Sequence, residues 1–91
     1  MNTVSPSTIC PVCGYDLGFK HWRGNSPSGE ICPSCEIQFG YYDATPDGHE
    51  GRLRIYKEWQ RRWIEEGMPW NGKGQPPPAG WNPTEQLKKI G

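Results

Sequence analysis

The sequence has few of the residues that usually build a hydrophobic core. Leu, Ile, Val and Phe together account for 13 of its 91 residues, a share at which chains often do not fold unaided. Five tryptophans and four tyrosines add apolar area, but 12 glycines and 10 prolines add none. A core this small requires a further stabilising element, such as a metal ion, disulfides or a partner chain.

The sequence also lacks an excess of charge of either sign. Ten Lys and Arg residues balance ten Asp and Glu residues, which excludes the strongly basic type of nucleic-acid-binding protein. No run approaches the roughly 18 apolar residues of a membrane span, and MNTVSPSTI at the N-terminus has no signal-peptide pattern. We therefore expect a cytoplasmic protein with no membrane partner, in which cysteines stay reduced.

What the sequence does contain is two Cys-x2-Cys pairs separated by 18 residues. Reduced cysteines at this spacing are typical of a four-thiolate metal site. Four protein ligands fill a tetrahedron and leave no position for a substrate or water, so the pattern indicates a structural rather than a catalytic metal. The predicted ligands are Cys10, Cys13, Cys32 and Cys35.

The residues around the two pairs favour tight turns. Pro11 and Pro33 follow the first cysteine of each pair, where the fixed φ of proline suits the start of a turn. Gly14 follows the first pair and is free to adopt a positive φ. Glu36 occupies the corresponding place after the second pair, so we expect the same turn there at a modest cost in strain.

The identity of the metal is less sharply defined than its ligands. The first pair, in CPVCGYDL, resembles the opening of a rubredoxin iron site. The second, in ICPSCEIQF, resembles it less, because the glycine is missing and the gap between the pairs is shorter than rubredoxins usually show. We therefore expect Zn²⁺, with iron as the alternative. With four cysteines present, His21 and His49 have no ligand position to fill.

Two stretches beside the cysteine pairs alternate between apolar and other residues, which predicts a strand leaving each pair. These are Tyr15, Leu17 and Phe19, and then Ile37, Phe39 and Tyr41. Glycines and serines between Gly24 and Gly29 predict the turn of a hairpin. Residues 20–23 (KHWR) are either a basic and aromatic patch for a partner or a solvated hairpin with one packed Trp.

A helix is predicted from Asp47 to Glu66, ended by Gly67 and Pro69. Its start has Thr45 or Asp47 as cap, Pro46 at the first helical position and Glu50 in the first turn. Apolar side chains at helical spacing are expected to pack on the metal-binding segment: Leu53, Tyr56, Trp59 or Gln60, Trp63 and Ile64. The opposite face carries predicted ion pairs: Arg54–Glu58, Glu58–Arg62, Arg61–Glu65 and Arg62–Glu66.

The C-terminal part is rich in tryptophan and proline. We expect Trp70 and Trp81 to pack this segment over the core. The alternative is that Pro76–Pro78 is an exposed polyproline motif that a partner recognises. A short helix is predicted to follow, with Asn82 as its cap, Pro83 as its first residue, and Glu85 completing a capping box. Leu87 and Ile90 would form the apolar face of that helix.

Together these features predict a small, metal-stapled α+β protein. Zinc-ribbon or rubredoxin-like β-hairpin knuckles would pack on one amphipathic helix, and a Trp/Pro-rich wrap would end in a short helix. Residues 1–9 would be a flexible tail and residues 10–91 a single domain. Within that domain, residues 10–44 form the metal ribbon, 45–67 the helix and 68–91 the wrap.

Four segments of the chain resemble the small bacterial cysteine-rich proteins of the CPCC type, which look zinc-ribbon-like. They are CPVCGYDL, ICPSCEIQFGYYD, RRWIEEGMPW and GWNPTEQLKKI. The chain departs from that type at Val12 and Ser34, where a further cysteine would give the CC of the name. The family is largely uncharacterised, and the resemblance implies an immunity or partner-binding role.

Three functions are compatible with these residues. The first is a non-enzymatic, zinc-stapled module that binds a protein partner of unidentified nature, and it is the one we expect. The second is a rubredoxin-like one-electron carrier with iron in the four-cysteine site. The third is a zinc ribbon that binds nucleic acid, which the balanced charge does not favour. No Ser/His/Asp or Cys/His set stands free of the metal site, so an enzyme is not expected.

Overall fold

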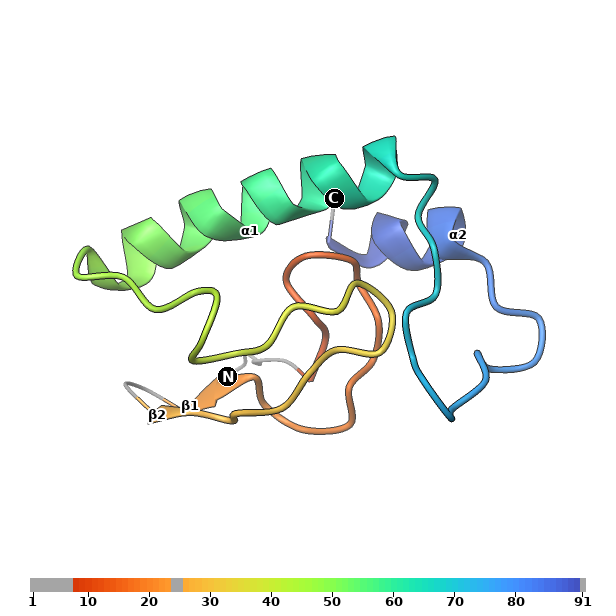
Figure 1. Cartoon of the computed structure of the whole chain (residues 1–91), viewed down its shortest axis with the longest axis horizontal. Coiled ribbons are helices and arrows are strands. Elements are labelled where there is room, and N and C mark those ends of the chain that lie inside the picture. The colour runs from red at the N-terminus through yellow and green to blue at the C-terminus, as the bar shows by residue number, and fades with distance from the viewer. Residues whose placement is uncertain (1–7, 24–25, 91) are drawn as a thin grey trace, which may run out of the picture.

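The computed structural model describes residues 8–23 and 26–90. A short antiparallel hairpin of β1 (Trp22–Arg23) and β2 (Ser26–Pro27) precedes a long helix, α1 (Gly48–Glu65). A short helix, α2 (Pro83–Leu87), and a 3₁₀ turn, η1 (Lys88–Ile90), end the chain. Both helices lie on one side of the loops that carry the cysteines (Figure 1). The protein is thus a small α+β structure, as the sequence predicts.

Parts of two predictions fall outside the described residues. Positions 1–7 of the predicted N-terminal tail are among them, and so are Gly24 and Asn25 of the predicted turn. The hairpin on either side of that turn is present, with Trp22 opposite Pro27 and Arg23 opposite Ser26. A hairpin between the two cysteine pairs is therefore confirmed, but the prediction of a turn through Gly29 was wrong, because Ser26 and Pro27 form strand β2.

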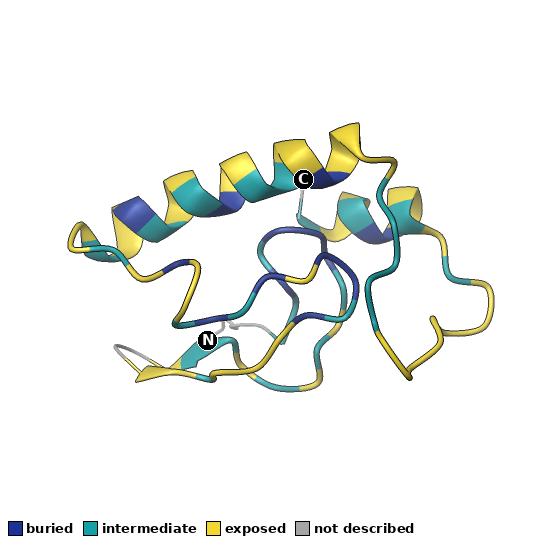
Figure 2. Ribbon diagram, in the orientation of Figure 1, coloured by how far each residue is buried: buried dark blue, intermediate teal, exposed yellow. Residues whose placement is uncertain are grey.

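The core of the protein is centred on sulfur rather than on aliphatic side chains. Among the described residues nine hydrophobic ones are buried, and four of these are cysteines. The buried positions of α1 lie along the face turned towards the cysteine loops (Figure 2). The nine residues are Cys10, Val12, Cys13, Cys32, Cys35, Ile37, Phe39, Tyr56 and Trp63.

The two cysteine pairs lie in two turns with the same backbone pairing, which we call the first knuckle (residues 9–16) and the second knuckle (residues 31–38). In each, the first cysteine accepts a hydrogen bond from the residue after the second cysteine and donates one to the residue beyond that. In the first knuckle these bonds are Gly14 N to Cys10 O at 3.0 Å and Cys10 N to Tyr15 O at 2.8 Å. In the second they are Glu36 N to Cys32 O at 2.8 Å and Cys32 N to Ile37 O at 2.9 Å.

The strands predicted to leave the knuckles are reduced to single bridges, Ile9 to Asp16 and Ile31 to Gln38. Alternation predicted a longer strand through Tyr41, but that side chain is 68% exposed. The reason is a turn at Gly40, whose φ of 92° takes the chain out of the extended conformation. The extended conformation that the alternating pattern predicts is therefore too short to form a regular strand.

Helix α1 begins and ends one residue inside its predicted bounds, which is within the usual uncertainty of helix ends. Asp47 is the N-cap residue, but its side chain makes no capping hydrogen bond. Thr45 Oγ1 instead accepts a hydrogen bond of 3.2 Å from the Asp47 amide. Pro46 precedes the cap, so its prediction as the first helical residue was wrong.

The apolar stripe of α1 is only partly buried. Tyr56 and Trp63 are buried, whereas Leu53 is 44% and Ile64 is 41% exposed. The prediction that Leu53 and Ile64 pack on the metal-binding segment was therefore wrong. The two knuckles cover a narrower strip of the helix surface than the apolar residues span, so the edges of the stripe face solvent.

The charged face of α1 pairs its residues differently from the prediction. Arg61 pairs with Glu65 at 2.8 Å, as predicted, and also with Glu58. Arg54 pairs with Asp47 at 2.5 Å rather than with Glu58. All of these groups are more than half exposed, so each pair contributes little to stability.

The buried carboxylate of Asp43 connects the hairpin to α1. It accepts hydrogen bonds from Trp22 Nε1 at 2.7 Å, Tyr56 Oη at 2.6 Å and the amide of Gly40 at 2.6 Å. The guanidinium of Arg52 lies 4.1 Å from the centroid of the Trp22 ring. Trp22 is therefore held by packing and hydrogen bonding between two elements.

The C-terminal segment returns over the knuckles through aromatic contacts. The Trp70 ring packs edge-to-face against Tyr15 at 5.4 Å and against Trp81 at 5.2 Å. Asn82 caps α2 by accepting a hydrogen bond of 3.1 Å from the Glu85 amide, as predicted. Leu87 is partly buried and packs against the core, as predicted, and Gln86 is the buried residue of α2.

Candidate metal centre

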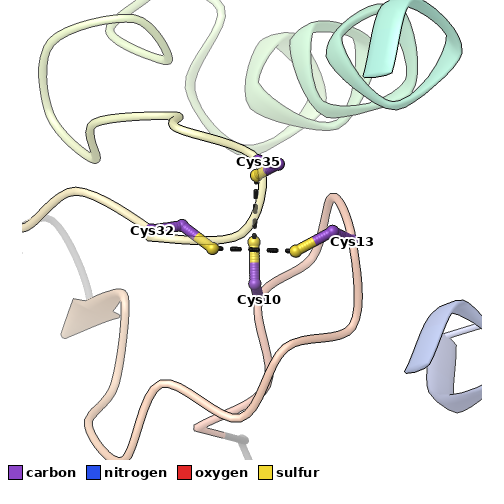
Figure 3. Close-up of side chains that lie close together, drawn as sticks. All are labelled: Cys10, Cys13, Cys32 and Cys35. Carbon is purple, nitrogen blue, oxygen red and sulfur yellow. Dashed lines mark hydrogen bonds between the residues drawn. The ribbon is translucent and has the colours of Figure 1, made fainter. Parts of the chain in front are cut away.

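The four predicted cysteine ligands come together between the two knuckles. Their Sγ atoms all lie within 4.8 Å of one another. Figure 3 shows that the knuckles face each other, with Cys10 and Cys13 on one loop and Cys32 and Cys35 on the other. The sulfur of Cys10 is 3.8 Å from that of Cys35, and the sulfur of Cys13 is 3.6 Å from that of Cys32.

These separations fit a metal-binding tetrahedron. With metal–sulfur bonds of about 2.3 Å, the sulfurs of a regular tetrahedron lie about 3.8 Å apart. A disulfide would bring two sulfurs to about 2.05 Å, and all four cysteines are free. The cluster can therefore hold a metal ion, and its four thiols fit either zinc or iron.

Burial makes the thiolate form of this cluster costly without a cation. Cys10, Cys13 and Cys32 have no exposed surface, and Cys35 is 3% exposed. Burial raises the pKa of the Cys10 and Cys35 thiols. Hydrogen bonding, led by that from Cys10, lowers the pKa of Cys13. A bound divalent ion would supply the positive charge that buried thiolates need.

Two side-chain amides cover the outward carbonyl groups of the first knuckle. Gln60, on α1, donates a hydrogen bond of 2.9 Å to the carbonyl of Val12. Gln86, on α2, donates to the carbonyl of Cys13 at 3.1 Å and to Ser34 Oγ at 3.0 Å. The Gln86 amide thus bridges both knuckles.

The second knuckle is covered at the corresponding carbonyl groups by different residues. Asn71, in the segment after α1, donates to the carbonyl of Ser34 at 2.8 Å. Trp59, on α1, donates its indole N–H to the carbonyl of Cys35 at 2.8 Å. Trp59 and Gln60 are neighbours in the sequence, so α1 contacts one knuckle with each.

Sequence reasoning missed this set of covering residues. Three of the four covering residues have amide side chains, and a polar amide in the sequence does not by itself indicate a position next to a buried site. The one available signal was Gln60, because a glutamine at a position of the predicted apolar stripe needs a hydrogen-bonding partner in the core.

The two knuckles differ most at the residue that follows the second cysteine. Gly14 and Glu36 both have a positive φ, 85° and 72°, so the predicted turn at Glu36 is present. A Cβ atom on Gly14 would lie 2.1 Å from the Gln86 carbonyl oxygen, so only glycine fits there. Glu36 is exposed and borders a cleft that residues of α1 also line.

Neither histidine belongs to the cluster of cysteines. The His21 ring packs 5.2 Å from Phe39 and 6.1 Å from Tyr56, and burial lowers its pKa. His49 is exposed in the first turn of α1. The structure therefore brings together the four cysteines that the sequence predicts as ligands.

Comparisons of this chain with protein-family models, with curated proteins and with solved structures find no match. Within residues 8–23 and 26–90, no helix is both long enough and apolar enough to cross a membrane.

Proposed function

We propose that the chain is a non-enzymatic, zinc-stapled module that binds a protein partner in the cytoplasm. The observation that carries the metal part is the buried set of four converging sulfurs. All four tetrahedral positions belong to the protein, which is typical of a structural zinc ion. When bound, such an ion supplies folding free energy rather than a reactive group.

The geometry of the two knuckles supports the proposed zinc-ribbon-like site. Two turns of the same hydrogen-bonding pattern face each other across the sulfurs, which is the arrangement expected of a zinc-ribbon or rubredoxin-like site. An immunity or partner-binding role of the CPCC type stays a prediction from the sequence.

The partner-binding part of the proposal is supported by an exposed apolar patch beside the second knuckle. Ile31 is 53%, Tyr42 47% and Tyr41 68% exposed. Ile31 and Tyr42 border the same groove of about 490 Å³, and the rings of Tyr41 and Tyr42 lie 4.9 Å apart. Aromatic residues are enriched in the cores of protein interfaces.

The first test is the metal content of protein purified without chelators from medium supplied with iron and zinc. We expect one zinc per chain, and loss of the near-ultraviolet circular dichroism of the tryptophans when a strong chelator removes it. A chain that is folded and free of metal would overturn the metal part of the proposal.

The second test concerns the apolar patch. Proteins retained by the wild-type chain are compared with those retained by Tyr41→Ser and by Leu53→Ser, since Leu53 is another exposed apolar residue, on α1. We expect one specific partner to be lost with Tyr41→Ser alone. An identical set with all three chains would contradict this choice of surface.

One observation favours the iron-containing electron carrier as a second candidate. From Cys35, aromatic side chains lead outward: Trp59 bonds its carbonyl at 2.8 Å, and the Tyr42 ring lies 4.8 Å from Trp59. The Tyr41 ring follows at 4.9 Å. One iron per chain, a red colour and a reversible redox wave in the metal analysis would select this function instead.

Nucleic-acid binding is the third candidate, and the charge distribution supports it least. Arg54 and Arg61 are paired with carboxylates on or next to α1. The chain as a whole has no net charge. A binding affinity for nucleic acid that falls steeply with salt would contradict the proposed function.

A further inference from the structure

The four cysteine residues are not equally shielded from solvent. Cys35 is 3% exposed, whereas the other three cysteines have no exposed surface. Cys35 also borders a cleft of about 110 Å³, which Trp59, Arg62 and Asn71 line as well. A cleft of this size holds a few water molecules or the end of a small reagent.

The asymmetry has a structural cause in the cover of the two knuckles. Cys13 corresponds to Cys35, but α2 lies against the first knuckle so closely that Gly14 has no room for a Cβ atom. Over the second knuckle the side chains of Trp59 and Asn71 bond the carbonyl groups of Cys35 and Ser34. Side chains from α1 and Asn71 therefore cover the second knuckle without the close backbone contact found at Gly14, and they leave the cleft open.

We infer that Cys35 is the site at which a small disulfide reacts with the metal-loaded protein. The lining of the cleft carries the carboxylates of Glu36 and Glu66 and the single guanidinium of Arg62. The excess of negative charge suits a disulfide that carries positive charge or none. This inference rests on the proposed zinc site, but not on the proposed partner.

The reaction is thiol–disulfide exchange. The Cys35 sulfur attacks one sulfur of the reagent R–S–S–R, whose S–S bond breaks, and R–S⁻ leaves with the electron pair. The Cys10 sulfur, 3.8 Å from that of Cys35, then attacks the Cys35 sulfur and expels the second R–S⁻. Two electrons pass from the two cysteine thiolates to the reagent, and only Cys13 and Cys32 would remain to hold a bound ion.

The site therefore acts as a sensor of disulfide stress in which one ligand reacts first. Loss of the Cys10 and Cys35 thiolates would leave two of the four metal ligands, so a bound ion would be released after modification of Cys35. Because the metal supplies folding free energy, release would also loosen the packing of both helices on the knuckles.

The test uses the full-length, zinc-loaded chain and cystamine, a cationic disulfide. Zinc release is followed with a colorimetric indicator, and the first adduct is located by peptide mass mapping. We expect the first adduct on Cys35, formed about tenfold faster than on any other cysteine, followed by a Cys10–Cys35 disulfide and loss of the zinc ion.

Asn71→Ala and Gln60→Ala are a matched pair of variants, because these amides cover corresponding carbonyl groups of the second and first knuckles. Removing Asn71 widens the cleft, so we expect the rate at Cys35 to rise about threefold or more. Gln60→Ala should leave the rate within about twofold of the wild-type value, with Cys35 still modified first.

Two outcomes would overturn the inference. One is a first adduct on Cys10, Cys13 or Cys32, or on all four cysteines equally, as in an unfolded chain. The other is equal acceleration by both variants, which would indicate general opening rather than access through the cleft. Zinc content, measured first, separates the proposals: a chain without zinc overturns the proposed function as well, and a zinc-loaded chain modified elsewhere overturns this inference alone.

Discussion

The first and second knuckles share a backbone and differ in what covers them. Their turns have equivalent hydrogen bonds, and each supplies two sulfurs to the cluster. The first is covered by side-chain amides and also by the backbone of α2, which lies against Gly14. The second is covered by the side chains of Trp59 and Asn71. Local sequence thus determines the shape of each turn, whereas distant parts of the chain determine how well it is shielded.

The largest expected effect is the same at both knuckles, because each supplies ligands to one metal ion. Cys10→Ser and Cys32→Ser remove corresponding ligands, and each should abolish metal binding. The metal contributes roughly 10 kcal/mol or more to folding, which is comparable with the whole stability of a small domain. We expect both variants to be unfolded in circular dichroism. Native stability in a metal-free Cys32→Ser protein would contradict the role of the metal as a staple.

The next effect should differ sharply between the knuckles. Gly14→Ala combines a positive φ with a Cβ atom 2.1 Å from the Gln86 carbonyl oxygen, and we expect it to destabilise the protein by about 3 kcal/mol or more. Glu36→Ala, at the corresponding position, should change stability by less than about 0.5 kcal/mol, because the backbone strain is already present. Urea denaturation of the zinc-loaded proteins measures both, and equal losses would show that the covers are equivalent.

Replacing the covering amides should also destabilise the protein more at the first knuckle than at the second, but by smaller amounts. Gln86 is buried and bonds Cys13, Ser34 and Trp81, so Gln86→Ala leaves several buried groups unpaired and should cost about 2–3 kcal/mol. Asn71, which is half-buried, should cost about 1 kcal/mol when replaced by alanine. Thermal unfolding at fixed zinc concentration tests this order. A larger loss from Asn71→Ala would reverse the ranking of the two covers.

The smallest expected effect is a gain. Glu36 holds a φ of 72°, a conformation that costs a non-glycine residue about 1–2 kcal/mol. Glycine relieves that strain but makes the unfolded chain more flexible. We expect Glu36→Gly to stabilise the protein by about 0.5–1 kcal/mol, seen as a higher midpoint in urea. A lower midpoint would mean that the Glu36 side chain makes a stabilising contribution of its own.

The sequence predicted the parts of the site that depend on neighbouring residues. The spacing of the cysteines predicted their meeting, and Glu36 was expected in a strained turn, where it lies. The covering residues could not be predicted, because Gln60 lies 48 residues, and Gln86 73 residues, from the group that it bonds in the first knuckle. The same limit explains Leu53: its helical spacing was correct, but the width of the surface beneath it depends on how both knuckles pack.

The buried carboxylate of Asp43 shows a similar limit. In the sequence it stands in a polar stretch before α1 and resembles a surface residue. In the structure three donors from separate segments converge on it, including Trp22 and Tyr56. A buried carboxylate needs hydrogen-bond donors around it, and only the tertiary structure brings these three together.

The convergence of the four sulfurs also bears on how the length of the segment between Cys13 and Cys32 affects stability. A metal ion that joins Cys13 to Cys32 closes a loop of 18 intervening residues, and for loops of this length a cross-link removes about 3 kcal/mol of unfolded-chain entropy. Doubling such a loop changes the closure entropy by only about 0.6 kcal/mol. We therefore expect an insertion between the two cysteine pairs to cost little stability in the metal-loaded protein, since a bound ion would set the distance between the knuckles.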